Sequence, residues 1–370
     1  MPRSKSDILS VPEPISKTGQ LMPHSVALSY GDQQLKYGEL DQRADRLAAP
    51  EGLVTLSYGG PKYIRMAQAL SLSYRRHNPA RPFAIITDQA SAHTLRTYFD
   101  IVIIVKQEYG PGTMQKLYVD LYSPFARTLF VDSDCLFYKD PGELWSLYAH
   151  GPFSVRGWRY LTGDTDYEKR TPYRWLQNTS EFLKQNGISR LPHFNNGVFY
   201  FDRSDTAKRL FAISRSLYER HAEFGFVPFK GAPISDETAM AVAMEKCGIN
   251  MDPWDSIHGM ETAIGMRKSL AINVLKGESR FLKDKIGRNP VLIHYNVDAQ
   301  EGLVYTRDVC RLLYETSRVR PLLFCEALAM TCVPALYKKV LRLAAEVLSL
   351  LRKNLRRIFA VRPTRPLTNS

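Results

Sequence analysis

Two acidic side chains stand at the end of a predicted buried strand. Residues 127–140 read RTLFVDSDCLFYKD, so the apolar run 128–131 leads directly into Asp132, Ser133 and Asp134. In an extended chain residues i and i+2 point to the same side, so we expect both carboxylates to project together. Two hard oxygen ligands suit Mg²⁺ or Mn²⁺, which would neutralise a diphosphate and make it a better leaving group. The alternative is a pair of ordinary turn aspartates.

A polar turn precedes a second apolar strand further along the chain. Residues 193–202 read HFNNGVFYFD, and Asn195, Asn196 and Gly197 form the turn before the strand predicted at 198–201. Amide side chains at such a turn can hold sugar hydroxyls through paired donor and acceptor bonds. The alternative is a simple turn with no ligand.

Two later segments add further polar groups. In 234–244, ISDETAMAVAM, Ser235 is suited to cap a helix whose first turn carries Asp236 and Glu237, which is also where acidic residues commonly stand without any function. In 290–296, PVLIHYN, His294 ends an apolar strand as Asp132 does. We therefore expect His294 and Asp132 to meet, although a lone histidine is often structural.

The elements that position these groups alternate between strand and helix. The pattern predicts strands at 53–58, 82–87, 101–105 and 128–131, separated by helices at 64–76, 92–99 and 114–122. Such alternation is typical of an α/β fold with a mainly parallel sheet covered on both faces. Ligands of such sheets bind outside the carboxyl ends of the strands, which here are occupied by Tyr58, Asp88 and Asp132.

The order of these motifs resembles glycosyltransferase family 8, the group that includes glycogenin and lipopolysaccharide galactosyltransferases. That family has a lysine-bearing helix, a D-x-D strand end, an F-N-S/A-G-V turn, a D-Q helix start and a late histidine. The corresponding segments here are QKLY with Lys116, D-S-D, FNNGV, Asp236-Glu237 and His294. The resemblance covers residues 53–305 and implies the nucleotide-sugar-binding fold called glycosyltransferase A. Glu237 stands where the family usually has glutamine.

The resemblance implies a glycosyltransferase that retains anomeric configuration, and the paired aspartates at the strand end predict that it depends on a metal. We expect Mn²⁺ or Mg²⁺ to be held by Asp132, Asp134 and His294. We expect Asp236, Glu237 and Asn195 to be catalytic. The predicted donor-binding residues are Tyr58, Asp88, Lys116, Asp132, Ser133, Asn196 and Gly197. The donor would be a nucleotide-diphosphate sugar, most simply a UDP-sugar.

Aromatic residues suggest where an acceptor could bind. Trp158, Tyr160, Tyr167, Tyr173 and Trp175 alternate with charged residues, namely Arg156, Arg159, Asp164 and Asp166. Ring faces beside polar groups suit a glycan, lipid-linked or natural-product acceptor, and core packing is the alternative.

Both ends of the chain differ from its centre, so we divide it into a leader (1–52), a catalytic domain (53–317) and a basic helical tail (318–370). Residues 25–49 resemble the opening of a nonribosomal peptide synthetase adenylation domain, with KYGEL at 36–40. The rest of that domain is missing, so we expect an inactive remnant, with a short amphipathic helix as the alternative.

The tail predicts contact with a membrane surface. Residues 337–370 hold nine basic residues against one acidic residue, Glu346. An apolar stripe recurs at steps of three and four: Leu336, Val340, Leu343, Val347, Leu351, Leu355 and Ile358. A basic amphipathic helix of this kind lies in a membrane interface. Docking on the catalytic domain is an alternative, whereas nucleic-acid binding is disfavoured because no reader motif is present.

Composition indicates the compartment and leaves two rival functions. The five cysteines are irregularly spaced without a C-x-x-C pair, which favours a reducing compartment, and the N-terminus has no secretory signal. We therefore expect a cytoplasmic protein, peripheral on the inner face of the membrane.

A sugar-nucleotide nucleotidyltransferase is one rival function, although 57–62 (SYGGPK) is a poor phosphate loop. The other is a non-enzymatic membrane-associated partner of a biosynthetic assembly line.

Overall fold

The computed structural model describes most of the chain. The described residues are 26–30, 33–36, 50–163, 176, 178–228, 234–254, 259–296, 299–300 and 302–317. The chain divides into two compact units, residues 1–296 and 297–370, and each is considered by itself. All residues of the predicted metal and donor site lie in the first unit.

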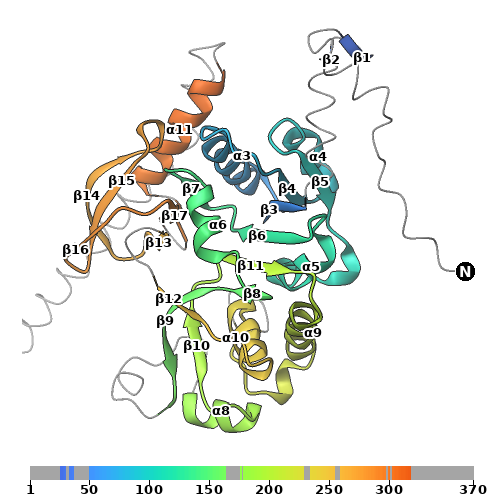
Figure 1. Ribbon diagram of the computed structural model, residues 1–370, viewed down its shortest axis with the longest axis vertical. Coiled ribbons are helices and arrows are strands. Elements are labelled where there is room, and N and C mark those ends of the chain that lie inside the picture. The colour runs from blue at the N-terminus through green and yellow to red at the C-terminus, as the bar shows by residue number, and fades with distance from the viewer. Residues whose placement is uncertain are drawn as a thin grey trace, which may run out of the picture. The chain divides into compact units, whose positions relative to one another are not determined.

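A six-stranded sheet forms the centre of the first unit (Figure 1). Its order is β5 (Ile101–Ile104), β4 (Phe83–Thr87), β3 (Glu51–Leu56), β6 (Arg127–Val131), β11 (Val198–Asp202) and β8 (Phe153–Ser154). The first four strands are parallel, β11 runs antiparallel to β6, and β8 runs antiparallel to β11. The predicted α/β fold with a mainly parallel sheet is confirmed.

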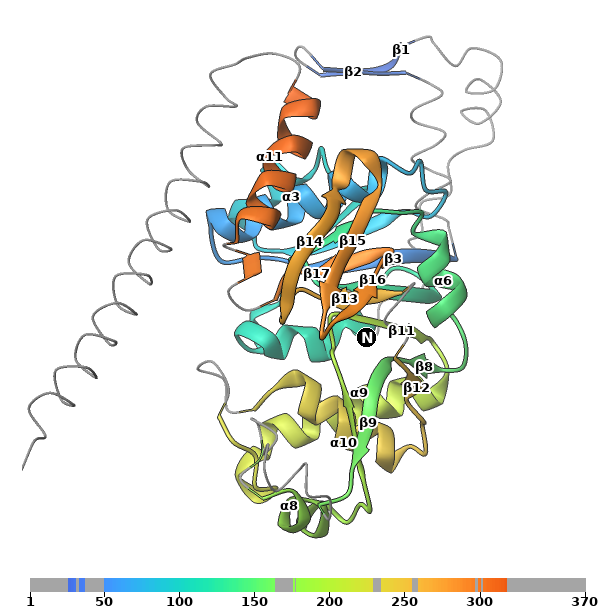
Figure 2. The ribbon, with the colours of Figure 1, turned by 90° about the vertical axis from the view of Figure 1, so that its left-hand side faces the viewer.

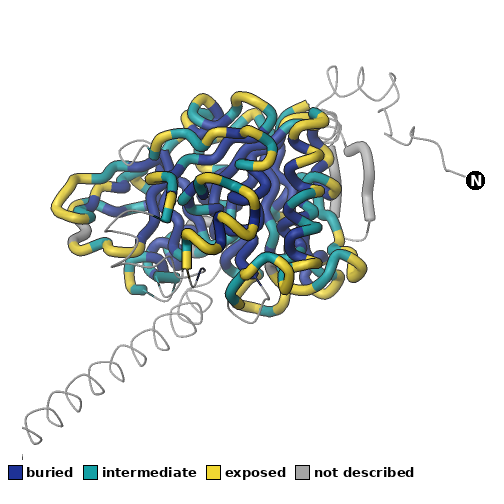
Figure 3. Tube along the Cα trace, turned by 90° about the horizontal axis from the view of Figure 1, so that it is seen from below, coloured by how far each residue is buried: buried dark blue, intermediate teal, exposed yellow. Residues whose placement is uncertain are grey.

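Helices cover both faces of the six-stranded sheet. Successive residues of a strand point to opposite faces, and here both sets are apolar, so each face must be buried. Phe130 packs into one core, with residues of α5 (Val119–Tyr122), α9 (Asp205–Glu219) and α10 (Asp236–Lys246). Its neighbours Leu129 and Val131 pack into the other, with residues of α3 (Pro61–Arg75), α4 (Gln89–Leu95) and α6 (Gly142–Tyr148). Figure 3 shows this buried interior beneath more exposed helices.

Three smaller sheets extend the first unit (Figure 2). One has the order β10 (Leu191–Phe194), β9 (Arg156–Leu161), β12 (Asp252–Pro253), and α8 (Thr179–Asn186) precedes β10 in the chain. A second has the order β13 (Met260–Thr262), β17 (Leu292–His294), β7 (Cys135–Phe137). The third is formed by β14 (Met266–Asn273), β15 (Glu278–Lys283) and β16 (Ile286–Arg288), with the short 3₁₀ helix η4 (Val274–Lys276) between its first two strands. Two further 3₁₀ helices are η1 (Gln107–Tyr109) and η3 (His221–Glu223).

The helical segment predicted at 114–122 is confirmed, although it is divided between two kinds of helix. The segment is a 3₁₀ helix, η2 (Gly112–Tyr118), followed by the short α5. Tyr118 has φ −110° and ψ 10°, outside the helical region, and this interrupts a continuous α-helix. The position of Lys116 therefore depends on a tighter helix with three residues per turn.

The ends of the chain are described only in part. β1 (Val26–Tyr30) and β2 (Gln33–Lys36) form an antiparallel hairpin, so the alternative of an amphipathic helix is wrong over these residues. The segment 37–40, which carries most of the resemblance to adenylation domains, lies outside the described residues. In the second unit, α11 (Leu303–Ser317) holds the buried Asp308 between Arg307 and Arg311. The predicted basic tail, 318–370, also lies outside the described residues. Among the helices that are described, none combines the length and apolarity needed to cross a membrane.

Candidate metal centre

The two predicted aspartates lie in a tight turn between two strands. β6 ends at Val131, and Asp132, Ser133 and Asp134 lead directly into β7. The Cys135 amide donates to the Asp132 carbonyl at 3.1 Å, and the Asp132 amide donates to the Gly197 carbonyl at 2.8 Å. The second bond continues the pairing of β6 with β11. The turn is therefore fixed to the asparagine-rich turn that precedes β11.

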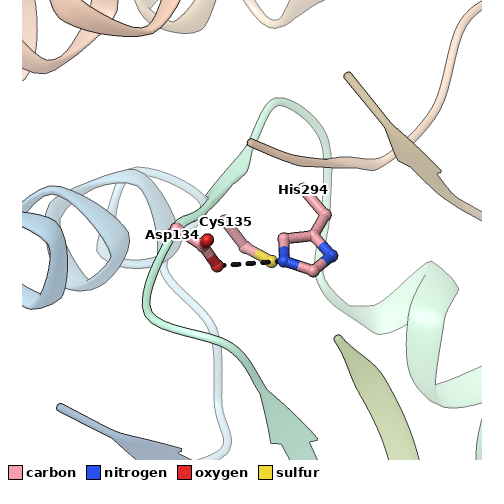
Figure 4. Close-up of side chains that lie close together, drawn as sticks. All are labelled: Asp134, Cys135 and His294. Atoms are coloured by element: carbon pink, nitrogen blue, oxygen red, sulfur yellow. Dashed lines mark ion pairs between the residues drawn. The ribbon is translucent and has the colours of Figure 1, made fainter. Parts of the chain in front are cut away.

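His294 reaches the same turn from a distant part of the chain. β17 pairs antiparallel with β7, and this pairing sets His294 opposite Cys135. The imidazole Nε2 lies 3.0 Å from Oδ1 of Asp134 and 3.7 Å from Oδ2 of Asp132. Figure 4 shows the Asp134 carboxylate facing the imidazole. The expectation that His294 meets the aspartates is borne out by this geometry.

Asn195 fixes the orientation of the His294 ring. Its Oδ1 lies 2.7 Å from Nδ1 of His294 and also accepts from the Gly197 amide at 3.1 Å. Because that oxygen acts as an acceptor, Nδ1 carries a proton in this arrangement. Nε2 then faces the two carboxylates and donates its proton to Asp134, and a bound metal would take the place of that proton.

Gly197 is required by the closeness of this packing. A Cβ atom at residue 197 would lie 2.3 Å from Nδ1 of His294 and 2.8 Å from Oδ1 of Asn195. Both distances are far below van der Waals contact. A side chain at this position would therefore displace the histidine and its orienting amide.

Lys116 contacts both Asp132 and Asp236 as well as the asparagine turn. Only 6% of this residue is exposed, and its Nζ lies 2.9 Å from Oδ1 of Asp132 and 3.4 Å from Oδ2 of Asp236. The ammonium also donates to the Asn196 carbonyl. Burial alone would lower the pKa of Lys116, but the two carboxylates outweigh burial and raise it, so the side chain stays charged. Its ammonium is therefore directed toward the two carboxylates of the site.

The start of α10 is bonded to the same turn. Oδ2 of Asp236 accepts from the Asn196 side-chain amide at 3.0 Å, and Oε2 of Glu237 accepts from the Asn196 backbone amide at 3.3 Å. Ser235 occupies the N-cap position, but its side chain makes no capping bond, so the predicted serine cap is wrong. The first-turn acids bind the turn across the site instead. Among the described residues, the buried Oδ1 of Asn196 has no hydrogen-bond partner.

The pKa values of the two carboxylates are shifted in opposite directions. Burial raises the pKa of Asp132, and its proximity to Asp134 adds to this, although Lys116 and His294 act in the opposite sense. Burial also acts to raise the pKa of Asp134, but His294 outweighs burial and lowers it. For His294 itself, burial acts to lower the pKa, and the two carboxylates raise it. The protonation of each of these three groups therefore depends on the other two.

The donor atoms favour a hard divalent cation. The described group whose ligand atoms all lie within 4.8 Å of one another is Asp134, Cys135 and His294. Cys135 was not predicted; its only signal in the sequence was its place next to Asp134. Burial raises the pKa of its thiol well above the usual value. Asp132 keeps one oxygen on Lys116 and directs the other toward His294. Two carboxylates and one imidazole therefore fit Mn²⁺ or Mg²⁺ better than a thiophilic ion.

The remaining predicted donor residues border the same edge of the sheet. β3, β4 and β6 are adjacent parallel strands, so Tyr58, Asp88 and Asp132 follow their carboxyl ends. The Tyr58 hydroxyl donates to the Gly112 carbonyl at 2.9 Å. Asp88 caps α4 through the Ser91 amide and also accepts from the Gly59 amide at 2.9 Å. Asp88 therefore shapes this loop, a structural role that the sequence did not indicate.

The aromatic segment is divided by the limits of the described residues. Trp158 and Tyr160 belong to β9, and Arg156 donates to the Leu147 carbonyl at 3.1 Å. The other members predicted to surround an acceptor lie outside the described residues: Tyr167, Tyr173, Trp175, Asp164 and Asp166.

Comparison with known proteins yields structural similarity without sequence similarity. No protein-family model matches the chain, and no curated protein matches it. The fold is similar to galactosyltransferase LgtC in complex with donor and acceptor sugar analogues, at 13% identity and a TM-score of 0.46, covering 75% of this chain and 99% of that one. It is also similar to glycosyltransferase GlyE of Streptococcus pneumoniae, at 16% identity and a TM-score of 0.36, covering 56% and 45%. Mouse xyloside xylosyltransferase 1 is similar at 11% identity and a TM-score of 0.39, covering 67% and 99%. These values are too low to carry a functional argument, which rests on the site geometry.

Proposed function

We propose that the protein is a metal-dependent glycosyltransferase that uses a nucleotide-diphosphate sugar as donor. One observation carries the proposal: Asp132 and Asp134 at the carboxyl edge of a parallel sheet converge with His294, whose Nε2 is oriented toward them by Asn195. Oxygen and imidazole ligands at the end of parallel strands suit a cation that binds a diphosphate. When bound, Mn²⁺ or Mg²⁺ would neutralise the charge that develops on that leaving group.

The chain's own residues would then have separate tasks. Asp132, Asp134 and His294 hold the metal, and Lys116 fixes Asp132 from within the protein. Asp236 and Glu237, which bond to Asn196 from the start of α10, would line the donor sugar. We assign Asn196 to the donor site because its side-chain amide bonds to Asp236.

We assign the other predicted contacts on the same basis. Tyr58 and Asp88 border the nucleobase end of the donor, and a UDP-sugar is the simplest candidate. Ser133 and Gly197 bring backbone close to the diphosphate. Retention of anomeric configuration, as in glycosyltransferase family 8, is part of the proposal. The acceptor would be a glycan, a lipid-linked sugar or a natural product, reached from the cytoplasm with the basic tail on the inner face of the membrane.

The loop after β3 argues against a nucleotidyltransferase. Gly59 and Gly60 both have positive φ, as a phosphate loop would allow, but the Gly59 amide already donates to Asp88. That amide is therefore not directed at a phosphate.

The test is release of UDP or GDP from a panel of nucleotide-sugars. The wild-type protein should hydrolyse at least one donor with Mn²⁺ present, and excess EDTA should stop the reaction. Asp134→Ala should reduce the rate at least a hundredfold, whereas the matched control Asp205→Ala, an aspartate paired on the surface with Lys208, should leave it unchanged. Activity that survives in Asp134→Ala, or release of pyrophosphate from a nucleoside triphosphate and a sugar phosphate, would contradict the proposal.

A further inference from the structure

β10, β9 and β12 form a small sheet (Figure 1). Trp158 of β9 and Trp254, which follows β12, form an aromatic pair. Trp158 in β9 is 40% exposed, which is unusual for so large an apolar ring. Its ring centroid lies 4.7 Å from that of Trp254, with an interplanar angle of 30°, and 5.1 Å from the His193 ring. The Trp254 amide donates to the Gly157 carbonyl at 2.8 Å. Trp158 is therefore held in place although it faces solvent.

A β-bulge accounts for the direction of Trp158. His193 pairs with Arg159 and Phe194 pairs with Gly157, so Trp158 is the additional residue of β9 between these pairs. An additional residue interrupts the alternation of side chains, so two successive residues share one face. Trp158 and Arg159 are accordingly both exposed, and Trp158 contacts the ring of His193. The bulge therefore explains why Trp158 and Arg159 are both exposed.

This face borders the candidate metal centre. β10 ends at Phe194, and Asn195 follows directly. The Cα atoms of His193 and Asn195 are separated by at most about 7 Å, the length of two extended residues. Asn195 in turn bonds to His294. A ligand that covers Trp158 and His193 would therefore approach the proposed reaction centre from the side of β9.

We propose that Trp158, supported by Trp254, is a stacking platform for a pyranose ring of the acceptor, with Arg159 and His193 bonding its hydroxyls. The inference rests on the proposed transferase function and specifies its acceptor as a saccharide. A pyranose presents an apolar C–H face and equatorial hydroxyls, which match a flat indole beside polar groups. Burial and then Arg159 lower the pKa of His193 to about 4, so its ring is neutral at pH 7 and both donates and accepts.

The test is a titration followed by saturation-transfer-difference NMR. The probes are the methyl α- and β-glycosides of D-glucopyranose and D-galactopyranose. At least one should bind the wild-type protein saturably. Loss of a stacked ring should raise its Kd about fivefold or more in Trp158→Ala. The Kd of the same variant for UDP, measured with Mn²⁺ present, should change little, because Trp158 is not proposed to contact the donor.

Two further variants make the result specific. Trp158→Phe keeps an aromatic face, so its Kd for the glycoside should lie between those of wild type and Trp158→Ala. Ile286→Ala removes an even more exposed apolar side chain, 53% exposed, from β16 and should bind the glycoside as wild type does. The inference is overturned if no glycoside binds, or if Trp158→Ala binds as tightly as wild type. If the protein cleaves donors but binds no glycoside, only this inference is contradicted. If it binds glycosides through Trp158 but cleaves no donor, the proposed function is contradicted.

Discussion

Replacing Lys116 with methionine should destabilise the protein even without any ligand. The ammonium is the cation within salt-bridge distance of both Asp132 and Asp236, and it is almost fully buried. Methionine preserves most of the apolar stem and removes the charge. The variant would leave two carboxylates in a poorly solvated site without their compensating cation.

The magnitude follows from the exposure of the partners. Removing one partner of a buried ion pair costs about 3–5 kcal/mol. The Asp132 side chain is 27% exposed and can recover part of its hydration, which favours the lower end of that range. We therefore expect Lys116→Met to lower the free energy of unfolding by about 3 kcal/mol at pH 7.

Urea unfolding followed by circular dichroism, with EDTA present, measures this loss. The matched control is Lys208→Met, because Lys208 is 62% exposed and pairs with Asp205 within one helix. An exposed pair of this kind should contribute less than about 0.5 kcal/mol. If Lys116→Met loses no more stability than the control, Lys116 does not neutralise the buried carboxylates and the reasoning fails.

Three further substitutions test neighbouring parts of the account. Asn195→Ala should weaken Mn²⁺ binding about 10- to 100-fold by calorimetry, because the His294 ring loses its orienting acceptor; unchanged affinity would show that the ring needs no such partner. Gly197→Ala should also reduce Mn²⁺ binding at least tenfold, since its Cβ would overlap the ring, and near-normal binding would contradict the packing. His193→Gln tests pH dependence: a folded pKa of about 4, below the unfolded value, gives stability that is present above pH 6.5 and lost as pH falls toward 4. Between pH 7 and 4.5 the free energy of unfolding, measured by urea titration, should fall by roughly 2 kcal/mol less in the variant than in wild type. Equal falls would place the His193 pKa near its ordinary value.

Much of the sheet and of the site was predictable because its signals are local. The apolar run ending at Asp132 and the apolar run ending at His294 each predict a strand with a polar residue at its end. The rule that ligands bind at strand ends then indicates that such residues meet. β7 and β17, which bring the turn and the histidine together, are only three residues each, too short for the pattern to predict their pairing.

The partners of individual side chains could not be predicted in the same way. Lys116 was expected to reach the donor, and nothing in the sequence indicated that its ammonium would also pair with Asp132 and Asp236. Ser235 has the residue type and position of a cap, yet makes no capping bond. The β9 bulge depends on register with β10, which no single strand encodes.

The most direct test of the central claim is a crystal grown with UDP and Mn²⁺, measured at the manganese absorption edge. The account predicts an anomalous peak about 2.1 Å from Nε2 of His294 and from an oxygen of each of Asp132 and Asp134, with diphosphate oxygens completing the coordination. A peak bound to Cys135, or UDP bound with no peak beside His294, would contradict it.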